Sequence, residues 1–268
     1  MKYLNHMSAY KDKNNIRNFW KSRVENSEDT VCTNDAQLDL MEEDQIIKRI
    51  KNNKSILEVG CGNGKLLNRL KKKISIKAYH GTDFVQELID KANKKYLKYK
   101  NINFDFFDMS TVSDNTFDTK FDYIISKRAI QNILSTKIQL KIIDNLGLHL
   151  RKNGKIILVE SSSNAQKNIN EMRKKYGLSK INPPFHNLFF NEKKLKSYKF
   201  KNVKLTEVDN FASNFYFITR VIYALYAQNY LKSPPSYSDY HNQIGLKIND
   251  NLLKIDFSQV KTFIFKRK

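Results

Sequence analysis

The stretch ILEVGCGNGKLL, residues 56–67, places three of the chain's eight glycines within five positions, between two apolar runs. A glycine inside a regular element costs roughly 0.5–1 kcal/mol relative to alanine, so a cluster of three marks a place where the backbone bends sharply or touches something closely. The residues before the cluster are typical of a buried strand. Those after it are typical of a helix, because Leu66, Leu67 and Leu70 share one helical face. The stretch therefore predicts a strand, a tight glycine turn and a helix.

From residue 54 onward, the chain continues to alternate between strand and helix patterns. Strands joined by helical crossovers predict a parallel sheet with helices on both faces, so the expected fold is α/β, a Rossmann-like, doubly wound, mostly parallel sheet of seven strands. We expect the last two strands to form an antiparallel pair at one edge. The helix before the fifth strand should extend to Leu150 and stop at RKNG, ahead of Gly154. The expected strands span residues 55–59, 76–83, 102–107, 121–126, 155–160, 203–208 and 261–266.

Two segments fall outside this alternation. Residues 1–53 predict an N-terminal helical lid segment, and about 161–200, which contain NPPFHNLFF, predict a helical insertion within a domain that spans 54–268. The first residues lack the apolar stretch of a signal peptide, and no run reaches the roughly 18–20 apolar residues that cross a bilayer, so we expect a cytoplasmic protein without a membrane span. The two cysteines, Cys32 and Cys61, have no metal-ligand spacing, and no metal is expected.

The formal net charge of +21 comes from 39 lysines and only nine arginines against 27 acidic residues. A chain this basic is often a nucleic-acid binder, because phosphate neutralisation supplies affinity. Base-edge and bidentate phosphate recognition favour arginine, however, and the lysines are scattered along the chain. We therefore favour a solvated coat of lysines and keep a nucleic-acid surface as the alternative.

The glycine turn itself indicates a ligand. In a doubly wound sheet the ligand lies beyond the carboxyl ends of the strands, where Gly60, Gly62 and Gly64 let the main chain approach a nucleoside and the helix start offers free N–H groups. The dinucleotide fingerprint requires a third glycine three positions after the second, and Lys65 stands there. The spacing G-x-G-x-G after Glu58 instead resembles motif I of the class I S-adenosylmethionine-dependent methyltransferases.

Three further motifs support this resemblance. Asp83 ends the second strand, 19 residues after Gly64, where an acid can accept both ribose hydroxyls and where the family also places one. FFDMS closes the third strand, and FDYIISKR (121–128) is similar to the fourth-strand motif, whose end lies near the methionine part and the transferred methyl group. The resemblance implies S-adenosylmethionine as the cofactor and methyl transfer as the reaction.

The resemblance also implies roles for individual residues. Phe84 would lie against the adenine, and Asp108 would accept its amino group beside the backbone of Met109, although Asp108 is equally typical of a helix N-cap. Trp20 and Arg23 are expected to fold over the cofactor as part of the lid. The full set expected to bind the cofactor is Glu58, Gly60, Cys61, Gly62, Asn63, Gly64, Asp83, Phe84, Asp108, Met109, Ser126, Trp20 and Arg23.

Methyl transfer to an alcohol needs a base, and histidine is the usual choice near neutral pH. Of the five histidines, His186 alone lies in a proline-introduced, aromatic-rich segment expected over the carboxyl edge of the sheet. It is a candidate catalytic base, with a packed core histidine as the alternative. Glu160 ends the fifth strand and is expected to face the same cleft, as a second candidate base or as a charge at a helix N-terminus.

Paired cations at the end of the fourth strand, Lys127 and Arg128, indicate an anionic acceptor, because arginine makes forked contacts with such groups. Alternatively, Lys127 reaches solvent and Arg128 ties down the N-terminal segment. Asn187 can orient an acceptor hydroxyl or cap a turn. Tyr216 and Arg220, one helical turn apart, can line the acceptor pocket or serve as core packing with a structural ion pair.

Later motifs narrow the expected function. RAIQNI (128–133), FHNLFF (185–190) and FASNFYFITRV (211–221) resemble a branch of small-molecule methyltransferases associated with bacterial surface-polysaccharide biosynthesis. The resemblance implies O-methylation of a small polar or anionic acceptor: a sugar, a nucleotide-linked sugar, or a phosphoramidate-type capsule precursor, whose acidic oxygen would need cations but no strong base. The alternatives are an RNA methyltransferase that uses the lysine-rich surface and a non-catalytic cofactor-binding subunit.

Overall fold

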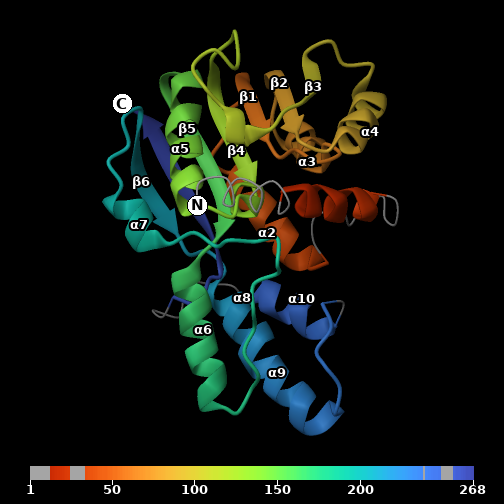
Figure 1. The fold of residues 1–268 in the computed structure, drawn as a ribbon. Helices are drawn as coiled ribbons and strands as arrows, with labels where there is room; N and C mark the ends of the chain where they lie inside the picture. The colour runs from red at the N-terminus through yellow and green to blue at the C-terminus, as the bar shows by residue number, and fades with distance from the viewer. Residues whose placement is uncertain (1–12, 25–33, 238, 249–255) are drawn as a thin grey trace.

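The computed structural model describes residues 13–24, 34–237, 239–248 and 256–268, arranged around a seven-stranded sheet in the order β3-β2-β1-β4-β5-β7-β6 (Figure 1). Strands β1 to β5 are parallel, and β7 is antiparallel to both β5 and β6. This confirms the predicted fold, including the antiparallel pair at one edge. The strands are β1 (Lys54–Val59), β2 (Ile76–Asp83), β3 (Ile102–Phe106), β4 (Phe121–Lys127), β5 (Leu150–Ser161), β6 (Val203–Asp209) and β7 (Val260–Arg267).

Helices bury both faces of this sheet, which explains the continuous apolar runs of its central strands. On β1, Ile56 packs into one core with α2, α3 and α4, and its neighbour Leu57 packs into a second core with α5. The helices are one over 13–24, α2 (Ala36–Ile47), α3 (Lys65–Lys73), α4 (Gln86–Tyr96), α5 (Thr136–Leu146), α6 (Ser163–Lys175), α7 (Glu192–Ser197), α8 (Ser213–Phe217), α9 (Tyr223–Tyr226) and α10 (Tyr240–Lys247).

A second group of helices, α6, α8, α9 and α10, gathers beyond the carboxyl ends of the parallel strands (Figure 1). The π-helical turn η4 (Ile218–Ile222) joins α8 to α9, and a second one, η5 (Ala227–Leu231), follows α9, so that 213–231 form one helical segment. Such turns occur frequently at functional sites. Among the described residues, no helix combines the length and apolar character needed to cross a membrane.

The predicted end of the helix before the fifth strand was wrong. Helix α5 ends at Leu146, a 3-10 turn η3 (Gly147–His149) follows, and β5 starts at Leu150. The chain leaves the helix early where it packs closely on β6: a Cβ on Gly147 would lie 2.4 Å from Cγ1 of Val203. The sequence RKNG therefore belongs to a long, irregular strand and does not terminate a helix.

The glycine turn provides a test of this packing. Gly60 has φ +79°, and a Cβ there would lie 2.1 Å from Cβ of Ala129, whereas Gly177, with φ +69°, has nothing within 4 Å. We expect Gly60→Ala to lower the free energy of unfolding by about 1–3 kcal/mol more than Gly177→Ala, because both variants share the backbone strain and only the first adds a steric overlap. Denaturant unfolding of the two variants measures the difference, and equal losses would contradict the close approach.

Candidate functional site

The turn between β1 and α3 is one that only glycine makes without strain. Gly60, Gly62 and Gly64 all have positive φ angles, +79°, +55° and +75°. The turn is fixed to the neighbouring strand, since the N–H of Gly60 donates to the carbonyl of Thr82 at 2.7 Å. Gly64 is the N-cap of α3 and brings no side chain to its N-terminus, where a Cβ would lie 2.8 Å from the Tyr96 ring. Cys61 and Asn63 complete this open turn.

Asp83 lies directly beside the turn, at the end of β2. Its Oδ2 accepts a hydrogen bond from the N–H of Gly62 at 2.9 Å, and its Oδ1 accepts one from the N–H of Val85 at 3.0 Å. Burial raises the pKa of Asp83 to about 6, against the effect of the backbone hydrogen bonds. Each carboxylate oxygen keeps a lone pair for a further donor. Asp83 can therefore accept further hydrogen bonds, and its binding of a ribose diol stays a prediction.

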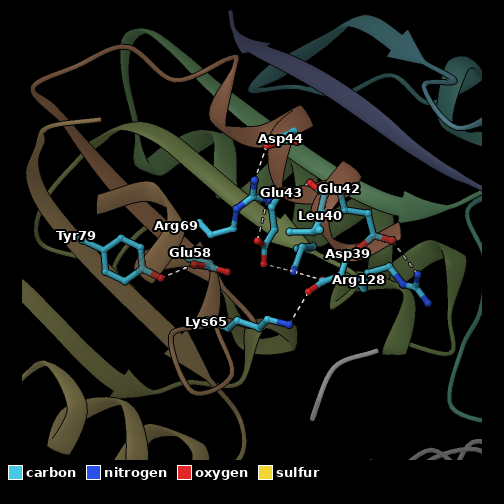
Figure 2. Close-up of polar contacts among 11 residues, drawn as sticks. Asp39, Leu40, Glu42, Glu43, Asp44, Glu58, Lys65, Arg69, Tyr79 and Arg128 are labelled. Atoms are coloured by element: carbon cyan, nitrogen blue, oxygen red, sulfur yellow. Dashed lines mark hydrogen bonds and ion pairs between the residues drawn. The ribbon is translucent and has the colours of Figure 1, made fainter. Parts of the chain in front are cut away.

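Glu58 is placed differently from the other predicted cofactor residues. It is fully buried within β1 and accepts a hydrogen bond from the hydroxyl of Tyr79 on β2 (Figure 2). Burial raises the pKa of Glu58 to about 8. The carboxyl group is therefore mainly protonated at neutral pH. Its hydrogen bond with Tyr79 links β1 to β2 below the glycine turn.

Helix α2 brings three buried carboxylates to the carboxyl ends of β1 and β4, where they meet basic side chains (Figure 2). Asp39 pairs with Lys127 at 2.5 Å and with Lys65, the first residue of α3, at 2.7 Å. Glu43 pairs with Lys127 at 3.0 Å and with Arg69 of α3 at 3.1 Å. Sequence reasoning missed this cluster, although LDLMEED (38–44) is an unusual concentration of acids in so basic a chain.

These ion pairs decide where the cations at the end of β4 point. The Lys127 side chain is 8% exposed and directed at α2, and its two carboxylates hold its pKa above the ordinary value despite burial. Arg128 pairs with Glu42 of α2 at 3.0 Å, so it does tie down the N-terminal segment. It also has a positive φ of +59°, and its buried Nε has no hydrogen-bond partner among the described residues.

A cavity lies between these strand ends and the helices α6, α8, α9 and α10. Its volume of about 450 Å³ is within the size range of small-molecule sites. Strand ends, the helix over 13–24, the segment after α6 and the α8–α9 helix all contribute to its walls. Lys127 and Glu160 do not line it. The predicted site residues that line it are Trp20, Arg23, Arg128, His186, Asn187, Tyr216 and Arg220.

His186 is buried in the wall of this cavity. Its ring stacks on Phe19 with centroids 4.2 Å apart and meets the edge of Trp20 at 5.4 Å. Burial, followed by the charges of Arg128 and Arg23, lowers the pKa of His186 to about 4. In the part of the chain that the structure describes, its Nδ1 has no hydrogen-bond partner, and the same holds for Oδ1 of Asn187. A neutral imidazole with an unused nitrogen can accept a proton or a hydrogen bond here.

Glu160 was expected to face the cleft, and the structure places it elsewhere. Its side chain is completely buried behind the turn that follows β4, and it accepts hydrogen bonds from the backbone N–H groups of Ile130 at 2.9 Å and Gln131 at 3.2 Å. Ser126, predicted to bind the cofactor, donates its hydroxyl to Glu160 at 3.0 Å. Burial raises the pKa of Glu160 to about 7. Its observed contacts shape the turn η2 (Ile130–Asn132), and Glu160 itself does not line the cavity.

The helix over 13–24 contacts both the residues at the cavity and Asp108, which was predicted to bind the adenine. Trp20 donates its indole N–H to Oδ1 of Asn132 at 2.8 Å and also packs near Phe84. At the other end, Lys13 forms an ion pair with Asp108, which caps the 3-10 turn η1 (Met109–Thr111) by accepting from the N–H of Ser110 at 3.0 Å. Burial acts to raise the pKa of Asp108, but Lys13 and Ser110 together lower it. The carboxylate predicted to accept the adenine amino group is thus held by Lys13.

A doubly wound sheet with this turn and an acid at the end of β2 has the class I methyltransferase fold. A family model described as a methyltransferase domain matches residues 50–212, more than half of the chain, and the chain belongs to this family. A putative methyltransferase of Invertebrate iridescent virus 6 is 26% identical over 98 residues, which cover 37% of this chain and 35% of the viral protein.

Solved structures share the fold. The phosphoethanolamine N-methyltransferase 1 of Haemonchus contortus, solved with phosphoethanolamine and S-adenosylhomocysteine, is 17% identical with a TM-score of 0.63. It covers 100% of this chain, which spans only 51% of the nematode enzyme. The N-methyltransferase NodS of Bradyrhizobium japonicum WM9, in complex with S-adenosylhomocysteine, is 11% identical with a TM-score of 0.54 and coverages of 94% and 98%.

S-adenosylmethionine is the cofactor of this family, and the residues present fit it. The buried carboxylate of Asp83 accepts one hydrogen bond on each oxygen from the backbone and has lone pairs left for ribose hydroxyls. The open N-terminus of α3 suits the carboxylate of the methionine part. When bound, the cofactor supplies a methyl group on a positively charged sulfur.

The contact between Lys13 and Asp108 can be tested directly. We expect Lys13→Met to tighten the binding of S-adenosylhomocysteine about two- to fivefold, because the variant frees a carboxylate that an exposed ion pair worth about 0.2–1 kcal/mol otherwise holds. Isothermal titration calorimetry measures the change. Lys21→Met is the matched control, since Lys21 lies on the same helix and pairs with Glu87 at 2.6 Å. Unchanged affinity for the Lys13 variant would contradict competition at Asp108.

Proposed function

We propose that this methyltransferase transfers the methyl group to an oxygen of a small polar or anionic acceptor, and that His186 holds the proton which the acceptor loses. The observation that carries the proposal is the buried, unpartnered Nδ1 of His186 in the wall of a cavity of about 450 Å³. Burying a polar nitrogen without a partner costs free energy, and an acceptor hydroxyl would provide the missing hydrogen bond.

Other residues of the chain would bind the cofactor and orient the acceptor. Asp83 and the glycine turn would hold the nucleoside end of the cofactor, and Trp20 would cover it. Asn187 offers an unpartnered carbonyl oxygen beside His186 and would orient the acceptor. Because much of the rate of an in-line displacement comes from alignment, we assign these residues to positioning.

The acceptor class follows from the cations of the cavity. Four of the nine arginines of the chain line it, and no lysine does among the described residues. Arginine is the residue that recognises planar or tetrahedral anions by forked contacts. A sugar that carries a phosphate or nucleotide group, or a phosphoramidate-type precursor of a surface polysaccharide, has this chemistry, and the motifs similar to that branch support the assignment.

An anionic acceptor would also change His186. The charges of Arg128 and Arg23 help to lower its pKa to about 4, and a bound anion would offset them. The imidazole would therefore become a stronger base when the acceptor is present, which suits a general base near neutral pH.

This proposal predicts a characteristic pH dependence. The neutral imidazole is the active form, so kcat/KM should fall as pH drops through about 4, the pKa of His186 in the free protein. The inflection in kcat should lie at higher pH because it reports the complex. We expect His186→Gln to reduce kcat by roughly 10²-fold or more at neutral pH, measured with labelled cofactor and a set of sugar phosphates and nucleotide sugars.

Two outcomes would contradict the role of His186. Full activity of His186→Gln, together with loss of activity in Arg128→Gln, would indicate an acidic oxygen that needs cations and no base. Mass spectrometry of the product that shows methylation of a nitrogen would also contradict it. The reaction would then be N-methylation, as in the names of the nematode and rhizobial enzymes.

A further inference from the structure

Two arginines, Arg173 of α6 and Arg220 of η4, line the cavity on its helical side. Figure 1 shows α6 beside the α8–α9 helix, beyond the carboxyl ends of the parallel strands. Arg173 is buried, with 8% of its surface exposed, and donates to the backbone carbonyls of Ser179, at 2.7 Å, and Arg220. Both residues line the cavity.

The two side chains differ in how their charge is balanced. Arg220 forms an ion pair with Asp35, and its guanidinium lies over the ring of Tyr237 at 4.8 Å from the centroid. For Arg173, the described residues provide no carboxylate within ion-pair distance. Its positive charge is therefore held in a buried wall next to a second cation, with only carbonyl dipoles as partners.

This arrangement is unfavourable without a ligand. A buried charge without a counter-ion costs several kcal/mol, and burial together with the charge of Arg220 lowers the pKa of Arg173. The hydrogen bonds to the carbonyls of Ser179 and Arg220 use two of the five N–H donors of a guanidinium and fix its plane. The other donors remain for a group in the cavity.

We propose that Arg173 and Arg220 form a subsite for a phosphate-type anion of the acceptor, separate from the atom that is methylated. This inference rests on the proposed function and narrows its acceptor to molecules with two features, a nucleophilic oxygen at His186 and a tetrahedral oxyanion at the helical wall. Arg173 anchors the anion by forked hydrogen bonds, while Asp35 and Tyr237 keep Arg220 oriented. The subsite sets specificity and takes no part in the transfer of the proton.

The experiment uses the full chain and inorganic phosphate as the probe. At constant ionic strength, kept with sodium chloride because the chain carries a charge of +21, phosphate should raise the thermal unfolding temperature, and the stabilisation should follow RT ln(1 + c/Kd) for one site, where c is the phosphate concentration. Arg173→Gln should weaken the apparent phosphate affinity at least tenfold, and Arg173→Lys should restore only part of it because lysine lacks the forked donors. Lys174→Gln is the matched control, since Lys174 is the next residue on α6, is exposed and bears the same charge.

The results separate the subsite from its alternatives. Binding of S-adenosylhomocysteine by Arg173→Gln verifies that the variant is folded. If Arg173→Gln and Lys174→Gln weaken phosphate equally, the anion binds the lysine surface and the inference is wrong. It is equally wrong if phosphate does not raise the unfolding temperature of the native chain above that in sodium chloride of the same ionic strength. Phosphate binding that depends on Arg173, without methyl transfer to any oxygen, would instead preserve the subsite and refute the proposed function.

Discussion

The structure depends on the ion pairs by which α2 joins the carboxyl ends of β1 and β4. The chain order of the sheet reverses between these two strands, so their ends spread apart and open the ligand site of a doubly wound fold. Asp39 contacts Lys65 on one side of this opening and Lys127 on the other. Replacing such buried ion pairs with apolar side chains is often neutral for stability, whereas removing one partner costs about 3–5 kcal/mol. The cluster therefore acts mainly by fixing one geometry of the opening.

In this geometry, the two cations at the end of β4, Lys127 and Arg128, have different surroundings. The charge of Lys127 is balanced by carboxylates of α2, and its side chain does not line the cavity. Arg128 has a left-handed backbone conformation; it forms an ion pair with Glu42 and also lines the cavity. A non-glycine residue in that conformation costs roughly 1–3 kcal/mol and is typical of functional sites.

The sheet could be predicted from the sequence because its signals are local. Apolar runs, crossover helices and the glycine turn specify β1 to β5, and the contacts of Gly62 with Asp83 follow from their places at adjacent strand ends. The side-chain partners could not be predicted in the same way. Lys127 finds its carboxylates 84 and 88 positions away on α2, and Glu160 turns inward to hydrogen-bond the turn after β4. Arg173 carries no local signal beyond being one of nine arginines, and only the fold brings it to Arg220.

The same distribution explains how so basic a chain would accommodate the proposed anion subsite. Lysine is strongly hydrated and keeps its charge at the end of a flexible stem, so a coat of lysines costs little when it faces water. Arginine is more weakly hydrated and its planar fork loses less entropy for each hydrogen bond, so it is the cation that tolerates a buried wall. In this protein, the residues that line the cavity include four arginines, whereas the lysine-rich last turns of α3 and α6 belong to amphipathic helices whose apolar faces are buried. The high net charge is therefore compatible with a small-molecule enzyme, because the cations that line the cavity are arginines, whereas lysines make up most of the charge of the chain.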